Sequence, residues 1–279
     1  MICSKEPRIS ELKRFHPKKM FGQNFLSDTG ILRSIVNAAA VKPDDTVLEI
    51  GPGKGTLTGI IASFCKVIAV EIDKGLVAFL REKFKDNPNV TIIEGDILEM
   101  DIPKLLPKKS KLIANIPYYI STPIIFKILE NREYFTTAVL TVQKELADRI
   151  TADHGSKIYG VLTVMVQFAA AARFMRLIPA AAFHPKPDVD SAVLRLDIPT
   201  KPTFRCNNEV FFREMVRAGF QHRRKMLRGS LQDIGLARES IEKALAVCGI
   251  KPEARPEEID IPGLVALSNV LSGEKREKA

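Results

Sequence analysis

A glycine-rich loop joins a strand-like run to a helical one in VLEIGPGKGTLT, residues 47–58. Three glycines, Gly51, Gly53 and Gly55, stand at alternate positions directly after the apolar run. Glycine lets a backbone approach a ligand that any side chain would push away, and the helix that follows begins with unpaired N–H groups. This order predicts an open α/β sheet with a ligand site at the carboxyl end of its first strand.

Strand-like and helical patterns alternate along the first half of the chain, from about residue 26 to 145. The expected strands are residues 46–50, 66–72, 89–95, 111–116 and 136–143, and the expected helices between them are 56–64, 74–84 and 123–130. Because the strands are apolar almost throughout, they predict a mostly parallel sheet covered on both faces. Two later strand-like runs, 171–178 and 191–199, predict an antiparallel pair at the end of that sheet.

The pattern changes after Pro199, where four helical runs are separated by glycine and proline breaks. We therefore place a boundary at residue 199. The prediction is a Rossmann-like α/β domain over residues 1–199 and a small all-helical domain over residues 200–279.

Charge and composition restrict the class of protein. The chain of 279 residues carries a net charge of +9, which favours a polyanionic partner. The four cysteines lie far apart and the four histidines form no cluster, so we predict reduced thiols and no metal. The N-terminus lacks an apolar signal core, and the longest apolar stretch is too short to span a bilayer and contains Gln167. These features predict a cytoplasmic protein that does not enter a membrane.

The glycine spacing separates the possible ligands of the loop. A dinucleotide loop would place its third glycine at position 56, which is Thr56, and the Gly-Lys-Ser/Thr ending of a P-loop is absent. The spacing resembles that of S-adenosylmethionine (SAM) methyltransferases, with a dinucleotide oxidoreductase as a distant alternative. At the next strand ends, Glu71 can accept from ribose hydroxyls and Asp96 from an adenine amine, although Asp96 could equally cap the following turn.

An unusual turn, NIPYYISTP (residues 115–123), follows the fourth strand. If the loops hold SAM, this turn lies beside its methyl group, and the target amine that the turn suggests is the exocyclic nitrogen of adenine. That nitrogen is a poor nucleophile because its lone pair is delocalised into the ring. The side-chain oxygen of Asn115 and a carbonyl fixed by the proline can accept its two N–H groups, and Tyr118 can stack on the base. The alternative is that Tyr118 and Tyr119 are packing residues and Asn115 forms the turn.

Seven motifs in order resemble the rRNA adenine N6-dimethyltransferases, in particular the KsgA type. They are FGQNFL, EIGPGKGTLT, VEID, GDIL, NIPYYISTP, QKELADRI and FHPKPDVDSAVLRL. The resemblance implies SAM as cofactor. The cofactor-binding residues that it implies are Gln23, Asn24, Leu26, Gly51, Gly53, Gly55, Glu71, Asp96 and Asn115. It also implies that Asn115 and the carbonyl of Ile116 meet the target amine, between the aromatic rings of Tyr118 and Phe183.

The family implies a substrate as well: N6,N6-dimethylation of two adjacent adenines in the 3′-terminal hairpin of small-subunit rRNA, within an assembling 30S-type subunit and by a monomer. The basic segments HPKK (16–19) and QHRRKMLR (221–228) are expected to meet the RNA backbone. Two alternatives stay open. One is an Erm-like enzyme acting on large-subunit rRNA, and the other is a mainly non-catalytic factor for small-subunit assembly.

Overall fold

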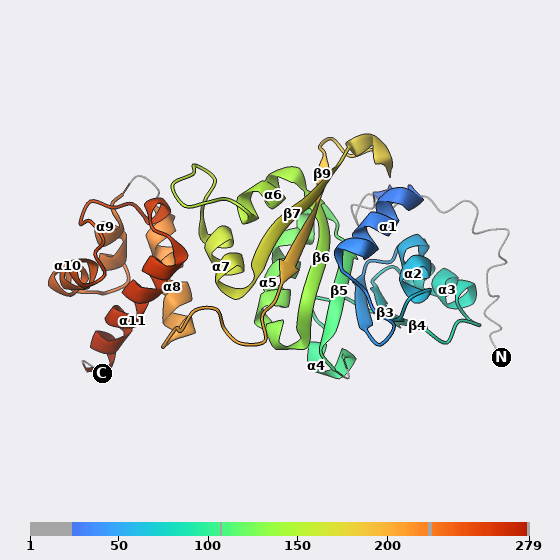
Figure 1. Cartoon of the computed structure of the whole chain (residues 1–279), viewed down its shortest axis with the longest axis horizontal. Coiled ribbons are helices and arrows are strands. Elements are labelled where there is room, and N and C mark those ends of the chain that lie inside the picture. Colours follow the sequence, from blue (N-terminus) through green and yellow to red (C-terminus); the bar gives the residue numbers. More distant parts are fainter. Residues whose placement is uncertain (1–23, 107, 223–224, 278–279) are drawn as a thin grey trace, which may run out of the picture. The chain divides into compact units, whose positions relative to one another are not determined.

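The computed structural model describes residues 24–106, 108–222 and 225–277 (Figure 1). Gln23 and the basic segment at residues 16–19 lie outside the described residues. The chain divides into two compact units. The first runs up to Lys144 and includes Arg173–Ile198, and the second consists of Glu145–Ala172 and the chain from Pro199 onward. One division between the units lies between Ile198 and Pro199, next to the predicted boundary, but the structure also assigns residues 145–172 to the second unit.

The first unit is built on a seven-stranded sheet in the order β4-β3-β2-β5-β6-β9-β7. Neighbours from β4 to β6 are parallel, as the sequence predicts. The two later strands, β9 and β7, lie side by side at the end of the sheet, as expected, and β9 is antiparallel to β6. The strands are β2 (Thr46–Ile50), β3 (Lys66–Glu71), β4 (Val90–Glu94), β5 (Ser110–Asn115), β6 (Phe135–Gln143), β7 (Ala171–Ile178) and β9 (Ser191–Asp197). After β2, the next two strands, β3 and β4, are added on one side of it, and β5 is then added on its other side. The carboxyl ends of β2 and β5 therefore flank a topological switch point, where such sheets bind ligands.

Helices cover both faces of this sheet. Figure 1 shows α1 (Thr29–Ala38) and α2 (Thr56–Ala62) on one side and α5 (Ser121–Glu130) on the other. Buried side chains of α1 and α2 share one apolar core with alternate residues of the strands, such as Val47 and Ile113. The opposite face buries the residues between them, such as Leu48. The remaining α-helices of this unit are α3 (Lys74–Lys83) and the short α4 (Ile102–Leu105).

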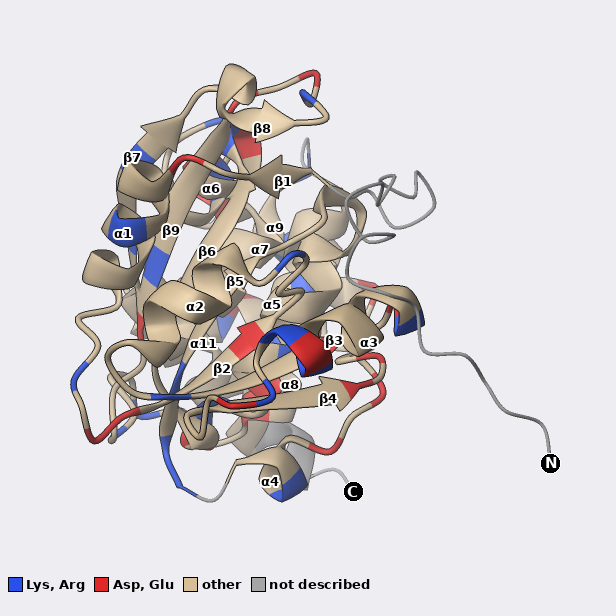
Figure 2. Cartoon of the chain, turned by 90° about the vertical axis from the view of Figure 1, so that its right-hand side faces the viewer, with Lys and Arg blue, Asp and Glu red and all other residues tan. Residues whose placement is uncertain are grey.

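A separate two-stranded sheet lies beside the switch point (Figure 2). It pairs β1 (Phe25–Leu26) with β8 (Phe183–His184) in antiparallel register, so that Leu26 is opposite Phe183. Two segments that the sequence associates with the ligand site are thereby brought into contact, although they are far apart along the chain.

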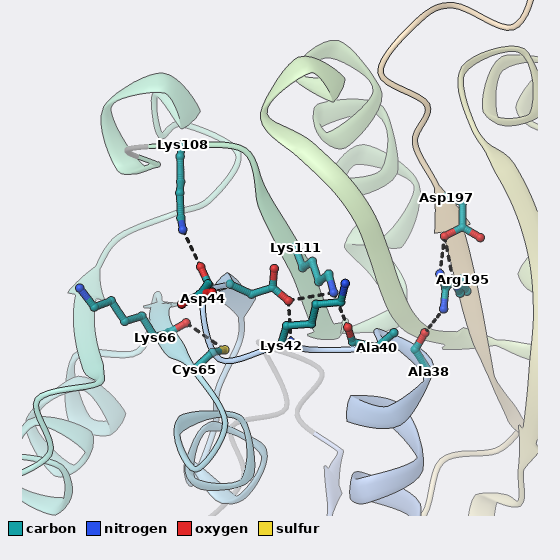
Figure 3. Close-up of polar contacts among 11 residues, drawn as sticks. Ala38, Ala40, Lys42, Asp44, Cys65, Lys66, Lys108, Lys111, Arg195 and Asp197 are labelled. Carbon is teal, nitrogen blue, oxygen red and sulfur yellow. Dashed lines mark hydrogen bonds and ion pairs between the residues drawn. The ribbon is translucent and has the colours of Figure 1, made fainter.

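Basic side chains of two strands hold the end of α1 at the edge of the sheet opposite the switch point (Figure 3). Lys111, at the start of β5, donates to the carbonyl of Ala40 and forms an ion pair of 2.9 Å with Asp45. Arg195 of β9 donates to the carbonyl of Ala38 at 2.6 Å. Burial alone would raise the pKa of the Asp45 carboxyl, but hydrogen bonds from Lys111 and the Lys42 backbone outweigh it, and the pKa is lowered. β5 is therefore anchored at the end remote from Asn115.

Lys111→Met should lower the free energy of unfolding by about 2–3 kcal/mol, because it leaves the half-buried Asp45 carboxylate without its cation. The matched control is Lys104→Met, which breaks a pair of 3.2 Å with Asp101 in which the lysine is 83% exposed. That change should cost no more than about 0.5 kcal/mol. Urea unfolding of both variants tests the difference, and equal midpoints would contradict it.

The second unit is all helical. Its helices are α6 (Lys144–Ile150), α7 (Val161–Ala169), α8 (Glu209–Gln221), α9 (Leu227–Gln232), α10 (Arg238–Val247) and α11 (Ile261–Glu277). Phe168 of α7 packs on Phe212 of α8 with ring centroids 4.5 Å apart, and Tyr159 donates to the carbonyl of Ile259. These contacts explain why the apolar stretch at 159–172 belongs to this unit. Within the described residues, no helix is both long and apolar enough to cross a membrane.

Candidate active site

A cavity of about 530 Å³ lies at the carboxyl edge of the sheet, beside the switch point. It is lined by the ends of β2, β3 and β5 together with β1 and β8. Nine predicted site residues line it: Asn24, Leu26, Gly51, Gly53, Glu71, Asp96, Asn115, Tyr118 and Phe183. Gly55 is not among the lining residues; a Cβ there would lie 2.6 Å from Leu80, which indicates a packing role for this glycine.

The glycine loop adopts a backbone that side chains disfavour. Gly51 and Gly53 have φ values of +68° and +57°, in the left-handed region. A Cβ on Gly53 would lie 2.8 Å from the ring of Phe25, so the loop and β1 approach as closely as glycine allows. From the far side, the Nζ of Lys83 donates to the carbonyl of Lys54 at 2.7 Å. The loop is therefore held from two directions around the cavity.

The Glu71 carboxylate is oriented by backbone N–H groups. Its Oε1 accepts from Ile72 and Asp73, each at 3.0 Å, and its Oε2 accepts from Gly53 at 3.2 Å. Burial raises the pKa of Glu71, and these three hydrogen bonds oppose the rise. The carboxylate is fixed at the end of β3, facing the glycine loop, where the ribose of an adenosine is expected.

Asp96 caps a turn and also lines the cavity, where a contact with adenine remains the prediction. Its Oδ1 accepts the N–H of Leu98 at 2.9 Å and so caps the turn after β4. It also lines the cavity. Capping holds the carboxylate at the cavity wall, so the two readings do not compete.

Sequence reasoning missed a third carboxylate, Glu49, which lines the cavity from near the carboxyl end of β2. Only 1% of the residue is exposed, and its Oε2 lacks a hydrogen bond of good geometry among the described residues. Burial raises the pKa of Glu49 to about 8, reinforced by the charge of Glu71 and opposed by Thr58 and Lys83. A polar residue inside an otherwise apolar strand is the signal that could have identified it.

Glu49→Gln should remove a pH dependence of stability. Because the pKa is raised on folding, the unfolded chain releases the Glu49 proton first as pH rises above about 4.5, and the native state loses stability until about pH 8. Glutamine mimics the protonated form. Its advantage over wild type should therefore grow by up to about 4 kcal/mol between pH 5 and pH 9, measured by urea unfolding without ligand. The exposed Glu82→Gln should follow wild type, and the same behaviour in Glu49→Gln would contradict the expectation.

Asn115 occupies the fourth strand end, directly across the switch point from the glycine loop. Its Nδ2 donates to the carbonyl of Asn24 at 3.2 Å, which ties the end of β5 to the segment before β1. With its nitrogen engaged, its oxygen is the atom left to accept from a ligand. The next residue, Ile116, is buried and donates its N–H to the carbonyl of Thr141 at 3.2 Å. The turn is thus held by the segment before β1 and by β6.

Two aromatic residues predicted to contact a base line the same cavity, but to different extents. Tyr118 begins a 3-10 turn, η3 (Tyr118–Ile120), and is half-buried, with its hydroxyl 2.6 Å from the Oγ of Ser191. Phe183 is 4% exposed and packs in the core beside Leu26. Tyr119 is 60% exposed and lies at the rim. The pocket therefore has one open aromatic surface and one that is largely embedded.

The hydrogen-bond acceptors that line the cavity fit an adenosine that carries a positive charge. Asp96 and Glu71 offer acceptors for an amine and for hydroxyls, and the free Oε2 of Glu49 is a buried acceptor suited to a cationic group. The glycine loop leaves room where a Cβ on Gly53 would collide with Phe25. These are observations of the protein itself, and they agree with the cofactor expected from the sequence.

Comparison with known proteins gives a consistent result. Residues 14–271 match the family described as ribosomal RNA adenine dimethylase. The chain is 43% identical to ribosomal RNA small subunit methyltransferase A of Geobacter metallireducens, over 91% of this chain and 95% of that one. The protein of the same name from Clostridium perfringens is 38% identical over 96% of this chain and 95% of its own.

Solved structures with a similar fold include two transferases. The 23S rRNA methyltransferase ErmE superimposes with a TM-score of 0.73 and 30% identity, over 89% of this chain and 100% of that one. A dimethyladenosine transferase from Plasmodium falciparum gives a TM-score of 0.76 and 27% identity, over 91% and 98%.

Proposed function

The chain belongs to the ribosomal RNA adenine dimethylase family, and on that basis we propose that it is a SAM-dependent methyltransferase that dimethylates N6 of two adjacent adenines in the 3′-terminal hairpin of small-subunit rRNA. The observation that carries the proposal is the position of Asn115. Its oxygen is available at the switch point, in the same cavity as the glycine loop and the Glu71 carboxylate. A base-binding turn and an adenosine-binding loop therefore share one enclosure.

Each group has a defined task in this reaction. Glu71, Asp96 and the glycine loop would hold the cofactor, which when bound supplies an electrophilic methyl group. The oxygens of Asn115 and Ile116 would accept the two N–H groups of the adenine amine, which returns electron density to its nitrogen. No strong base is required, because orienting a nucleophile within reach of the methyl group supplies most of the acceleration. Tyr118 stacks on a base that has left its own helix or loop.

The helical unit, in our proposal, binds the phosphate backbone of the RNA. The segment at residues 221–228 carries Lys225 and Arg228 among its described residues, and backbone neutralisation by such cations makes binding fall steeply with salt. We further propose that the protein acts in the cytoplasm as a monomer on an assembling small subunit.

A second candidate substrate is large-subunit rRNA, because ErmE shares the fold over most of both chains. The small-subunit reading is preferred because relatives at 38–43% identity over nearly their whole length are named small subunit methyltransferases. A mainly structural role in assembly predicts a different phenotype. Growth of a deletion strain would then be restored by a catalytically inactive variant.

The deciding experiment offers labelled SAM with undermethylated small subunits and, separately, with naked large-subunit rRNA, followed by nucleoside analysis. N6,N6-dimethyladenosine in the small-subunit hairpin is the expected product. Label confined to large-subunit rRNA would move the protein to the Erm-like class. Cofactor binding without transfer to either RNA would contradict the proposed reaction.

A further inference from the structure

A hydrogen bond joins the phenol of Tyr118 to a serine on another strand. Ser191 opens β9, and its Oγ lies 2.6 Å from the Tyr118 hydroxyl. Because β9 runs antiparallel to β6 with Ser191 opposite Gln143, the start of β9 lies at the same edge of the sheet as the cavity (Figure 1). Ser191 is fully buried, so water cannot replace its bond to Tyr118.

The residue before Ser191 holds the segment that carries the second aromatic ring. The Oδ1 of Asp190 accepts the N–H of Ala180 at 2.9 Å. Ala180 opens the 3-10 turn η5 (Ala180–Ala182), and Phe183 follows it directly. The backbone carbonyl of Asp190 accepts the N–H of Lys144 at 3.0 Å, which fixes Asp190 to the end of β6. Two consecutive residues therefore anchor both aromatic elements of the cavity.

These hydrogen bonds can set the distance between the two aromatic rings. Tyr118 and Phe183 belong to segments far apart in the sequence, yet a flat base held by both rings requires their separation to be set within about 0.5 Å. Hydrogen bonds to Asp190 and Ser191, the residue before β9 and its first residue, restrict that separation before a base arrives. Preorganisation of this kind reduces the ordering cost of binding.

We propose that Asp190 and Ser191 are positioning residues that set the spacing between the rings of Tyr118 and Phe183, and thereby keep the target base in place through both methyl transfers. The inference rests on the proposed function. Neither residue touches the reacting atoms. Their effect is on how long the base stays aligned, so a looser slot lets the singly methylated base leave before the second transfer.

The first test removes the Tyr118–Ser191 hydrogen bond from either side. Ser191→Ala and Tyr118→Phe should each lower the rate of methyl transfer about fivefold and raise the share of N6-monomethyladenosine in the product. The affinity for SAM, measured by calorimetry, should change less than twofold. The double variant should be no worse than either single one, because both remove the same interaction. Tyr118→Phe leaves the buried strand intact and therefore remains informative if Ser191→Ala fails to fold.

The second test uses two substitutions of Asp190. Asp190→Asn keeps an acceptor oxygen for the Ala180 N–H, whereas Asp190→Ala removes it. The asparagine variant should retain the dimethyl product of wild type, and the alanine variant should accumulate monomethyladenosine. A role of the charge alone would instead make the two variants equally defective, and that result would overturn the assignment of Asp190.

The control is Ser268→Ala in α11, which truncates a buried serine whose hydroxyl has no hydrogen-bond partner in the described part of the chain. It should give the wild-type product ratio. If Ser191→Ala and Tyr118→Phe also give that ratio while wild type makes dimethyladenosine, the positioning role is wrong and the proposed function stands. If wild type makes no methylated adenine on small subunits, both are overturned.

Discussion

Asn115→Ala is expected to reduce methyl transfer to small-subunit RNA by about 100- to 1000-fold, the range found when one preorganised polar group that stabilises a transition state is removed. The substitution deletes the oxygen that accepts from the adenine amine, and the nitrogen lone pair then stays delocalised in the ring. Cofactor affinity should fall only a few-fold, because Glu71 retains its three backbone hydrogen bonds. Single-turnover transfer and calorimetry with SAM measure the two effects separately.

Two further variants test whether the loss in Asn115→Ala comes from the missing acceptor oxygen. Asn131→Ala removes another amide that donates to a backbone carbonyl, that of Lys127 at 2.9 Å, but Asn131 does not line the cavity, and the change should leave transfer unchanged. Asn115→Asp keeps an acceptor while losing the donor to Asn24. It should therefore retain more activity than Asn115→Ala. Equal loss in both Asn115 variants would show that the tie to Asn24 matters more than the acceptor.

The fold was largely predictable because its signals are local. Each parallel strand is a short apolar run bounded by polar or glycine residues, as in β2 and β5, and the alternation of these strands with helices indicates a mostly parallel sheet. The division into units was less predictable. An apolar helix such as α7 does not reveal from its own sequence which partner it packs on, and the decisive contact, Phe168 with Phe212, joins residues distant along the chain.

The site shows the same distinction. Gly51, Gly53, Glu71 and Asp96 lie at or just after the ends of strands, and their positions in the chain are enough to bring them to one edge of the sheet. Glu49 and Ser191 escaped prediction because their significance lies in what surrounds them. A buried carboxylate without a good partner and a serine hydrogen-bonded to the hydroxyl of a distant tyrosine are properties of tertiary packing.

Gly53→Ala is expected to weaken SAM binding by about 100-fold. The residue has φ +57°, which costs an L-amino acid about 1 kcal/mol or more. The new Cβ would also lie 2.8 Å from the Cε1 of Phe25, so the ring or the loop must move where the cofactor is expected. Movement of the loop would in addition displace the N–H that Gly53 donates to Glu71 at 3.2 Å. Calorimetry with SAM measures the loss.

Gly155→Ala is the control that separates the backbone strain of Gly53→Ala from the collision of its new Cβ with Phe25. Gly155 has φ +83°, but a Cβ there would meet nothing within 4 Å. Gly155→Ala should lose about 1 kcal/mol of stability, because alanine is forced into the left-handed region. Gly53→Ala should lose at least as much, because the collision with Phe25 adds to the same strain. Only Gly53→Ala should lose cofactor affinity as well, since only its Cβ collides with a side chain that lines the cavity. Unchanged SAM affinity in Gly53→Ala would show that Phe25 moves aside at no cost, and that the close approach of loop and β1 is not what shapes the cofactor site.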